Sequence, residues 1–398
     1  METPLLHALI SPAVKAWALA LVLLPVPLLE ARAQGAAQTS AVVRSAKAAF
    51  VVETVATGLQ HPWGLAFLPD GRMLVTERPG RLRIVSREGA LSAAVPGLPR
   101  VLAQGQGGLL DVALDPAFAQ NRLVYLSFAE PREGGRNGTS VARGRLSEDG
   151  ARLADVSAIF RQQPAHNGGL HFGSRLVFAP DGDLFVTLGD RYTQRDEAQN
   201  PANHIGKLVR IRPDGTPAPG NPGASGRAGW LPEIFSIGHR NVQGAAINPA
   251  TGQIWTAEHA ARGGDEVNHP EVGRNYGWPI ITYGVDYSGA KIGIGTRREG
   301  LEQPLYYWDP SIAPSGMAFY TGDLFPGWRG NVFVGALAGA ALARLELDGE
   351  KIVREERLLE GEGDRIRDVR QGPDGSLYLL TDDQRGKILR LKPADARP

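Results

Sequence analysis

The chain has 398 residues, a formal net charge of +1 and no cysteine. The near-neutral charge argues against nucleic acid or an anionic membrane as a partner, and the lack of cysteine excludes disulfides and thiolate metal sites. Fifty glycines, 29 prolines and short apolar runs predict an all-β protein with many turns.

The N-terminal residues have the pattern of a removable export signal, which we place at residues 1–34. Lys15 precedes the apolar run 16–29, and Ala31-Arg32-Ala33 gives a small-x-small cleavage pattern. Two prolines interrupt the run and weaken it as a membrane span. A retained membrane anchor is the alternative interpretation.

The Ala/Ser-rich residues 35–47 are predicted to be a flexible leader. Residues 48–394 then form the folded domain. A protein exported in this way is expected in the periplasm or outside the cell, with no membrane span after signal removal.

A repeated unit follows, in which an apolar strand, a turn of the Pro-Asp-Gly type and a second apolar strand succeed one another. Proline sets φ for the first turn position and glycine supplies the positive φ that closes the hairpin. Its six copies begin at Trp63, Leu110, Arg175, Gly244, Gly316 and Arg367.

Six repeated hairpins predict a six-bladed β-propeller of four-stranded antiparallel blades. A pair of β-sandwiches is the structural alternative, but it does not predict a repeated motif. The wider spacings predict long insertions between blades at residues 127–169, 190–239 and 258–315, and loops of that length are usually functional.

Polar side chains stand just before the first strand of several copies. Because the copies are equivalent, these residues are expected to face one another at one end of the propeller channel. His171, in a Gly-rich loop that enters a strand, is the candidate general base. The arginines favour a planar anionic ligand, since guanidinium groups pair bidentately with carboxylates. The set is Gln106, His171, Arg240, Asn241, Arg365 and Arg367.

The segment 258–287 carries a second group of polar residues, in Gly263–Asn268 and Asn275–Pro279. Carboxylates, amides and backbone carbonyls are oxygen ligands that suit Ca²⁺ better than a soft transition metal. A solvated acidic loop without metal is the alternative.

Several ordered motifs resemble the glucose/sorbosone dehydrogenase family, and more closely its soluble periplasmic aldose sugar dehydrogenases that use pyrroloquinoline quinone (PQQ). The resemblance extends from about Phe50 to the C-terminus. The motifs are G-Q-G-G-L-L-D, H-F-G-S-R-L-V-F, G-H-R-N-V-Q-G, G-G-D-E-V-N, N-Y-G-W-P, S-G-M-A-F-Y and R-I-R-D-V.

The resemblance implies oxidation of an aldose at C1 to a lactone. His171 matches the base that removes the proton from the C1 hydroxyl, while hydride passes to C5 of PQQ. Asp190 matches the acidic residue that orients this base. Positions that hold PQQ in the family are matched by Gln106, Arg240, Asn241, Tyr287, Arg365 and Arg367.

The resemblance also implies calcium. Glu266 and Tyr276 match ligands of a structural Ca²⁺, and the backbone carbonyls of Ala260 and Ala261 match those that hold a second, Lewis-acidic Ca²⁺. The family usually has Gly-Pro at these two alanines, and a lysine where this chain has Ala338. These departures bear on cofactor affinity more than on the fold.

Two other functions fit a six-bladed propeller. One is a calcium-dependent lactonase or related hydrolase, and the other is a non-catalytic binding propeller that has lost its cofactor. The preferred sugar and the electron acceptor cannot be read from the residues. We expect a monomer, because a propeller closes on itself.

Overall fold

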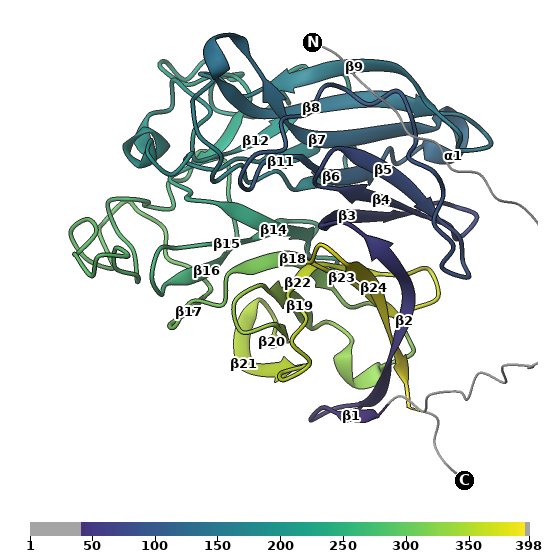
Figure 1. Cartoon of the computed structure of the whole chain (residues 1–398). Helices are drawn as coiled ribbons and strands as arrows, with labels where there is room; N and C mark the ends of the chain where they lie inside the picture. The colour runs from purple at the N-terminus through teal and green to yellow at the C-terminus, as the bar shows by residue number, and fades with distance from the viewer. Residues whose placement is uncertain (1–40, 395–398) are drawn as a thin grey trace, which may run out of the picture. The chain divides into compact units, whose positions relative to one another are not determined.

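The computed structural model describes residues 41–394, which form six antiparallel sheets in a ring (Figure 1). The predicted signal peptide lies outside the described residues. No helix in the described range is long and apolar enough to cross a membrane. The six-bladed β-propeller predicted from the repeats is confirmed.

The first three blades follow one another along the chain. Blade 1 has three strands, β3 (Pro62–Phe67), β4 (Met73–Glu77) and β5 (Arg81–Val85). Blade 2 contains β6 (Leu109–Leu114), β7 (Leu123–Pro131), β8 (Asn137–Leu146) and β9 (Leu153–Arg161), with the short helices α1 (Phe118–Asn121) and η1 (Glu133–Gly135) at its turns. Blade 3 contains β10 (Leu176–Phe178), β11 (Leu184–Thr187), β12 (Lys207–Ile211) and β13 (Ile234–Ile237), with η2 (Arg195–Gln199) after β11.

The remaining blades close the ring. Blade 4 contains β14 (Val242–Ile247), β15 (Ile254–Glu258), β16 (Asp265–Asn268) and β17 (Tyr306–Trp308). Blade 5 contains β18 (Pro314–Phe319), β19 (Val332–Ala336), β20 (Ala341–Asp348) and β21 (Lys351–Leu358), with η3 (Pro326–Trp328) between its first two strands. Blade 6 contains β22 (Ile366–Gln371), β23 (Leu377–Thr381) and β24 (Gly386–Pro393).

An N-terminal strand completes blade 6. β2 (Ala49–Leu59) pairs antiparallel with β24, and Figure 1 shows purple β2 beside the yellow C-terminal strands. β1 (Val42–Arg44) pairs with β2, so the last part of the expected leader forms a strand. The two ends of the folded chain therefore share one sheet, which holds the ring closed.

The first strands of the six blades line the channel, each in contact with the next around the ring. Their Pro-Asp-Gly turns form as predicted: in blade 1 the Gly71 N–H donates to the Leu68 carbonyl (2.8 Å), and Gly71 has φ +83°. Blade 3 repeats this geometry at Gly182. The hairpins read from the sequence are thus the two inner strands of each blade.

The predicted insertions are only partly loops. Residues 127–169 were expected to be an insertion, but they contain the outer strands β8 and β9 of blade 2. The other two stretches likewise contain β12 and β13, and β16 and β17. The long loops that remain, within residues 188–206 and 269–305, bring residues to the channel mouth.

The hydrophobic core is distributed between blades. One buried cluster lies at each interface between neighbouring blades, for example Tyr125 and Val141 of blade 2 against Leu176 and Val186 of blade 3. Five further clusters lie at the other five interfaces. Packing between sheets therefore fixes the ring and the positions of the loops at its ends.

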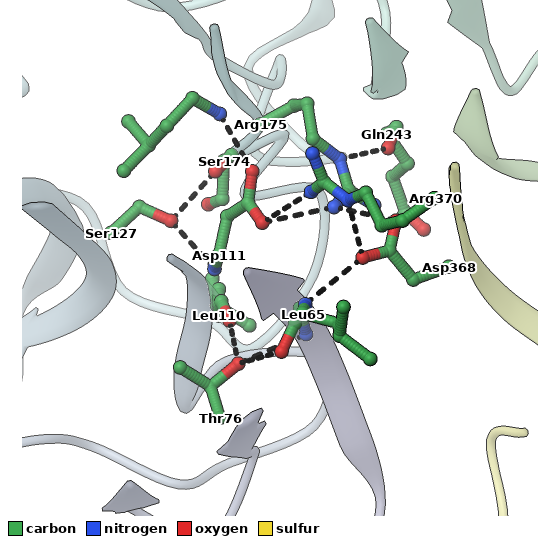
Figure 2. A network of polar contacts seen from close by, with 12 residues as sticks. Leu65, Thr76, Leu110, Asp111, Ser127, Ser174, Arg175, Gln243, Asp368 and Arg370 are labelled. Carbon is green, nitrogen blue, oxygen red and sulfur yellow. Dashed lines mark hydrogen bonds and ion pairs between the residues drawn. The ribbon is translucent and has the colours of Figure 1, made fainter. Parts of the chain in front are cut away.

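A network of charges closes the channel just below the starts of the inner strands. Figure 2 shows Asp111, Arg175, Asp368 and Arg370, which we call the channel plug. Arg175 is 3.0 Å from both carboxylates, and Arg370 lies 2.9 Å from each of them. Two positive and two negative charges balance in a buried position.

The repeat explains how the plug fits. One equivalent position of the six inner strands is occupied by Gly64, Asp111, Arg175, Gly244, Gly316 and Asp368, in blade order. Three blades thus carry a charge at this position, and three carry a glycine that leaves room. A methyl group on Gly316 would lie 2.3 Å from Asp368 Oδ1 and 2.6 Å from Asp368 Cα.

The plug divides the channel in two. Beyond it, the ends of the inner strands of all six blades line a cavity of about 460 Å³. On the other side, the loops that precede the inner strands carry the predicted site residues. Those loops form the mouth described next.

Candidate functional site

His171 and Asp190 form a hydrogen-bonded pair in blade 3. His171 lies in the loop before β10 and Asp190 follows β11, and His171 Nδ1 is 2.6 Å from Asp190 Oδ1. Both side chains are buried. With the Nδ1 proton donated to the carboxylate, the neutral imidazole carries its lone pair on Nε2.

Asp190 is fixed by two further donors. The indole Nε1 of Trp278, from the long loop of blade 4, donates to Asp190 Oδ2 (2.8 Å), and the Tyr192 backbone N–H donates to Oδ1 (2.8 Å). Gly189 allows this close approach, because a Cβ there would lie 2.2 Å from the His171 carbonyl oxygen. The carboxylate therefore holds one orientation toward the imidazole.

The backbone of His171 is held in the left-handed region, with φ +51°. Its N–H donates to Gln106 Oε1 (2.9 Å), and the Gln106 N–H donates to the Gly169 carbonyl (2.7 Å). Asn241 Oδ1 accepts from the Gly173 N–H (3.1 Å). The left-handed backbone conformation of His171 costs about 1 kcal/mol or more. The side chains of Gln106 and Asn241, which were predicted beside His171, maintain it.

Burial lowers the pKa of His171 below its ordinary value. The hydrogen bond to Asp190 acts in the opposite direction, and the positive charges of Arg240 and Arg191 lower the pKa further. The imidazole is therefore neutral at pH 7 and able to accept a proton.

Arg240 bridges blades 3 and 4 beside this pair. Its guanidinium lies over the Trp278 ring, 5.2 Å from the centroid, and donates to the carbonyls of His259 (3.0 Å) and Ala260. Its backbone N–H donates to Glu258 Oε2 (2.7 Å). Arg240 thus presents a positive charge toward His171.

The arginines of blade 6 surround Asp382 on the opposite side of the mouth. Arg367 donates to Asp382 Oδ2 (2.8 Å), and Arg365 lies 3.5 Å from the same oxygen. Burial alone would raise the pKa of Asp382, but the charge and hydrogen bond of Arg367 hold that pKa well below its usual range. Asp382 is ionised and orients both guanidinium groups.

The mouth contains polar atoms that fit a bound polar molecule. Buried nitrogens of Asn241, His259 and Arg367 have no hydrogen-bond partner among the described residues. Buried polar groups are usually satisfied, so unpaired donors and acceptors in a cleft indicate a missing ligand. Together with the arginines, they fit the planar tricarboxylate expected from the family resemblance.

A cleft of about 430 Å³ opens beside Asp190 and Arg240. Tyr192, Tyr287, Ala261 and Trp278 are among the residues that line it. Tyr192 contacts the His171 ring edge to face, with centroids 5.3 Å apart. The Tyr287 side chain is 59% exposed, so it is accessible to a molecule bound in the cleft.

Three of the predicted calcium residues line a small internal cavity, whereas Ala261 lines the cleft beside Asp190. Glu258, Glu266, Tyr276 and Ala260 line the cavity, and the Asn268 amide nitrogen donates to both carboxylates (2.9 and 3.0 Å). Burial and the neighbouring Glu258 raise the pKa of Glu266 to about 8. The Asn268 Oδ1 atom is buried without a partner in the described part of the chain.

Two carboxylates and an unpaired amide oxygen fit the donor chemistry of Ca²⁺. The Tyr276 hydroxyl is already engaged, since it donates to the His269 carbonyl (2.5 Å) and accepts from the Glu271 N–H (2.9 Å). At the second expected calcium position, the Ala260 carbonyl already accepts a hydrogen bond from the Arg240 guanidinium. The calcium ligands remain predictions, with the better fit at Glu266.

The structure places the predicted residues at one end of the channel or in the loops around it, except Glu266, which lies on β16 of blade 4. Trp278 and Arg191 are additions that sequence reasoning missed. Trp278 belongs to the N-Y-G-W-P motif, which carries part of the family resemblance and was considered for oxygen ligands, but its indole was not assigned to the site. Arg191 directly follows Asp190 and holds the base loop through the Gly168 carbonyl (2.8 Å) and Asn137 Oδ1 (2.6 Å).

Comparisons with known proteins cover most of the propeller. The family model "Glucose / Sorbosone dehydrogenase" matches residues 59–390. Aldose sugar dehydrogenase YliI of Escherichia coli (strain K12) is 46% identical over 357 residues, which cover 89% of this chain and 96% of that protein.

Solved structures agree with these matches. A glucose dehydrogenase crystal structure is 54% identical, with a TM-score of 0.85, and the match covers 86% of this chain and 100% of that one. The PQQ-bound form of aldose sugar dehydrogenase from Streptomyces coelicolor is 30% identical, with a TM-score of 0.72 and coverage of 86% and 98%.

Proposed function

This chain belongs to the glucose/sorbosone dehydrogenase family, and on that premise we propose that it is a PQQ-dependent aldose dehydrogenase. The substrate would be an aldose, oxidised at C1 to the lactone. The observation that carries the proposal is the buried His171–Asp190 pair facing an arginine-lined mouth.

In the proposed reaction, His171 Nε2 takes the proton of the C1 hydroxyl. Asp190 keeps the other ring nitrogen protonated and stabilises the imidazolium that forms. Trp278 prevents Asp190 from turning away. When bound, PQQ would accept the hydride that leaves C1; with the proton taken by His171, the sugar loses two electrons and two protons in total.

The proposed cofactor contacts come from blades 2, 4 and 6. Arg240, Arg365 and Arg367 would pair with carboxylates, because bidentate charge-assisted hydrogen bonds are the strongest available to such groups. Gln106 and Asn241 would border the cofactor while holding the base loop, and Tyr287 would cover it from the cleft. Calcium is proposed at Glu266 and Tyr276, and at the carbonyls of Ala260 and Ala261.

The leader pattern of residues 1–34 supports a proposed location in the periplasm or outside the cell. Electrons would pass on to an acceptor that the chain does not identify. We propose residues 48–394 as the dehydrogenase domain, and a monomeric enzyme.

Reconstitution tests the proposed function. The purified protein, supplied with PQQ and Ca²⁺, should reduce an artificial electron acceptor when given one or more of a panel of aldoses. We expect His171→Ala to lower turnover by at least about 100-fold while PQQ still binds in an optical titration. Turnover that survives this substitution would exclude His171 as the base.

The same preparation distinguishes the proposed dehydrogenase from the two alternative functions. Hydrolysis of a sugar lactone without PQQ, together with no sugar-dependent reduction of the acceptor, would favour a calcium-dependent lactonase. Absence of PQQ binding, of turnover on any sugar and of lactone hydrolysis would favour a non-catalytic binding propeller that has lost its cofactor.

A further inference from the structure

Arg78 lies at the channel mouth although it belongs to no predicted site motif. It follows β4 in blade 1, where its backbone N–H donates to the His61 carbonyl (3.0 Å) and its carbonyl accepts from the Leu109 N–H (3.1 Å). Its guanidinium Nη1 donates to the Gly105 carbonyl (2.6 Å). The side chain therefore reaches the loop that carries Gln106.

Arg78 adds charge to a region that is already positive. Arg365 and Arg367 lie 3.5 and 2.8 Å from Asp382, and the charge of Arg78 contributes to the lowered pKa of both Asp382 and Arg367. Three guanidinium groups thus gather around one carboxylate. An excess of positive charge held together in a partly buried mouth is unfavourable unless an anion joins it.

Blade 5 contributes no charge to this part of the mouth. Its loop Gly335–Ala340 contains only glycine, alanine and leucine. The loop lies beside the arginine group, because Arg365 Nη1 donates to the Leu337 carbonyl (3.0 Å). An anionic ligand placed here would meet cations from blades 1, 4 and 6.

We infer that Arg78 is a further cofactor-binding residue, whose guanidinium pairs with a carboxylate of the bound tricarboxylate from blade 1. This inference rests on the proposed function. The single hydrogen bond to Gly105 orients Arg78 and leaves its other N–H groups for the ligand. Arg78 thereby supplies a positive charge that blade 5 lacks at Ala338.

Two variants separate the charge of Arg78 from its role in holding the loop. Arg78→Gln keeps a hydrogen-bond donor for the Gly105 carbonyl but removes the charge. Arg78→Lys keeps the positive charge, but the lysine ammonium cannot form the bidentate hydrogen bonds of a guanidinium. Arg72→Gln is the matched control, because Arg72 lies in the turn at the other end of blade 1 and pairs with Asp70 at the surface.

The test is titration of the apoprotein with PQQ and, separately, with its uncharged trimethyl ester, in the presence of Ca²⁺. Arg78→Gln should weaken PQQ binding by about tenfold or more and leave ester binding unchanged. Arg78→Lys should restore part of the affinity, and the salt dependence of PQQ binding should be less steep in Arg78→Gln than in wild type.

Equal PQQ binding by Arg78→Gln and wild type would overturn the inference. Equal losses for PQQ and the ester would also overturn it, because the residue would then act only through the Gln106 loop. If the wild-type protein binds no PQQ, the proposed function fails together with this inference. The wild-type titration therefore distinguishes the two failures.

Discussion

The protonation state of His171 is set by groups from several segments. Asp190 favours the protonated imidazole, whereas burial, Arg191 and Arg240 favour the neutral one. His259 and Tyr192 also face this ring. The balance favours the neutral form, which a base needs before substrate arrives.

This balance predicts the pH dependence of the reaction. A base acts only when unprotonated, so kcat/KM should be constant near neutral pH and fall as the pH drops through the pKa of free His171. That pKa lies below 6.5. Asp190→Asn removes the group that raises it, so the acidic limb should move to still lower pH while kcat falls by about 100-fold or more.

The measurement is a pH profile of kcat/KM for wild type and variant. Asp155→Asn is the control, because Asp155 is an exposed carboxylate on blade 2. An acidic limb above pH 6.5 in the wild type would contradict the prediction.

The glycines of the inner strands determine how closely neighbouring blades can approach each other. Gly316 in β18 lies against Asp368 of β22, and Gly64 in β3 lies against Asp111 of β6. Neither glycine has a positive φ. Their role is to leave space for the plug carboxylates, so any side chain there must displace a neighbouring strand.

Gly316→Ala should therefore destabilise the fold by about 1–3 kcal/mol, the usual range for overpacking. Gly138→Ala is the matched control within a strand, because a Cβ there would meet only atoms 3.6 Å away. Urea denaturation of both variants measures the difference. A Gly316→Ala protein as stable as Gly138→Ala would show that the inner strands can move apart without cost.

The repeat motif predicted the inner hairpins because their turns are specified locally by proline and glycine. The outer strands were less visible. β8 contains Gly138, Ser140 and Arg143, so its sequence resembles a polar loop until the neighbouring strands provide partners. β2 was not predicted as the closing strand, since its partner β24 lies more than 300 residues away in sequence.

The site was predictable where it follows the repeat. Gln106 and His171 occupy equivalent loops, and the structure joins them by a hydrogen bond. Trp278 and Arg78 reach the site from other positions, Trp278 from a long loop and Arg78 from the end of a second strand. No local pattern indicates which way such side chains turn once the blades assemble.

Across the whole ring, the channel plug links five of the six blades. Asp368 accepts from the Leu65 N–H of blade 1 (3.1 Å), and Arg175 of blade 3 donates to the Gln243 carbonyl of blade 4 (3.1 Å). Blade 2 contributes Asp111, and blade 6 contributes Asp368 and Arg370 (Figure 2). These contacts fix the blades relative to one another at the floor of the site.

Removing one plug charge should weaken the whole propeller. Asp368→Asn leaves an uncompensated buried positive charge, which typically costs about 3–5 kcal/mol. Thermal or urea unfolding measures this loss, with the exposed Asp149→Asn as control. A loss below about 1 kcal/mol would mean that the plug behaves like a surface ion pair.

The arrangement of charges and glycines around the channel also distinguishes the charged repeats from those that carry glycine. A blade that carries aspartate fits only beside neighbours that offer arginine or empty space, so moving or deleting a blade that carries a charge would bring like charges together or leave a charge without its partner. Cutting the ring at a surface turn and joining the old ends keeps the cyclic order. An engineered version of this propeller can therefore begin at a different surface turn, but it must keep the order of its repeats.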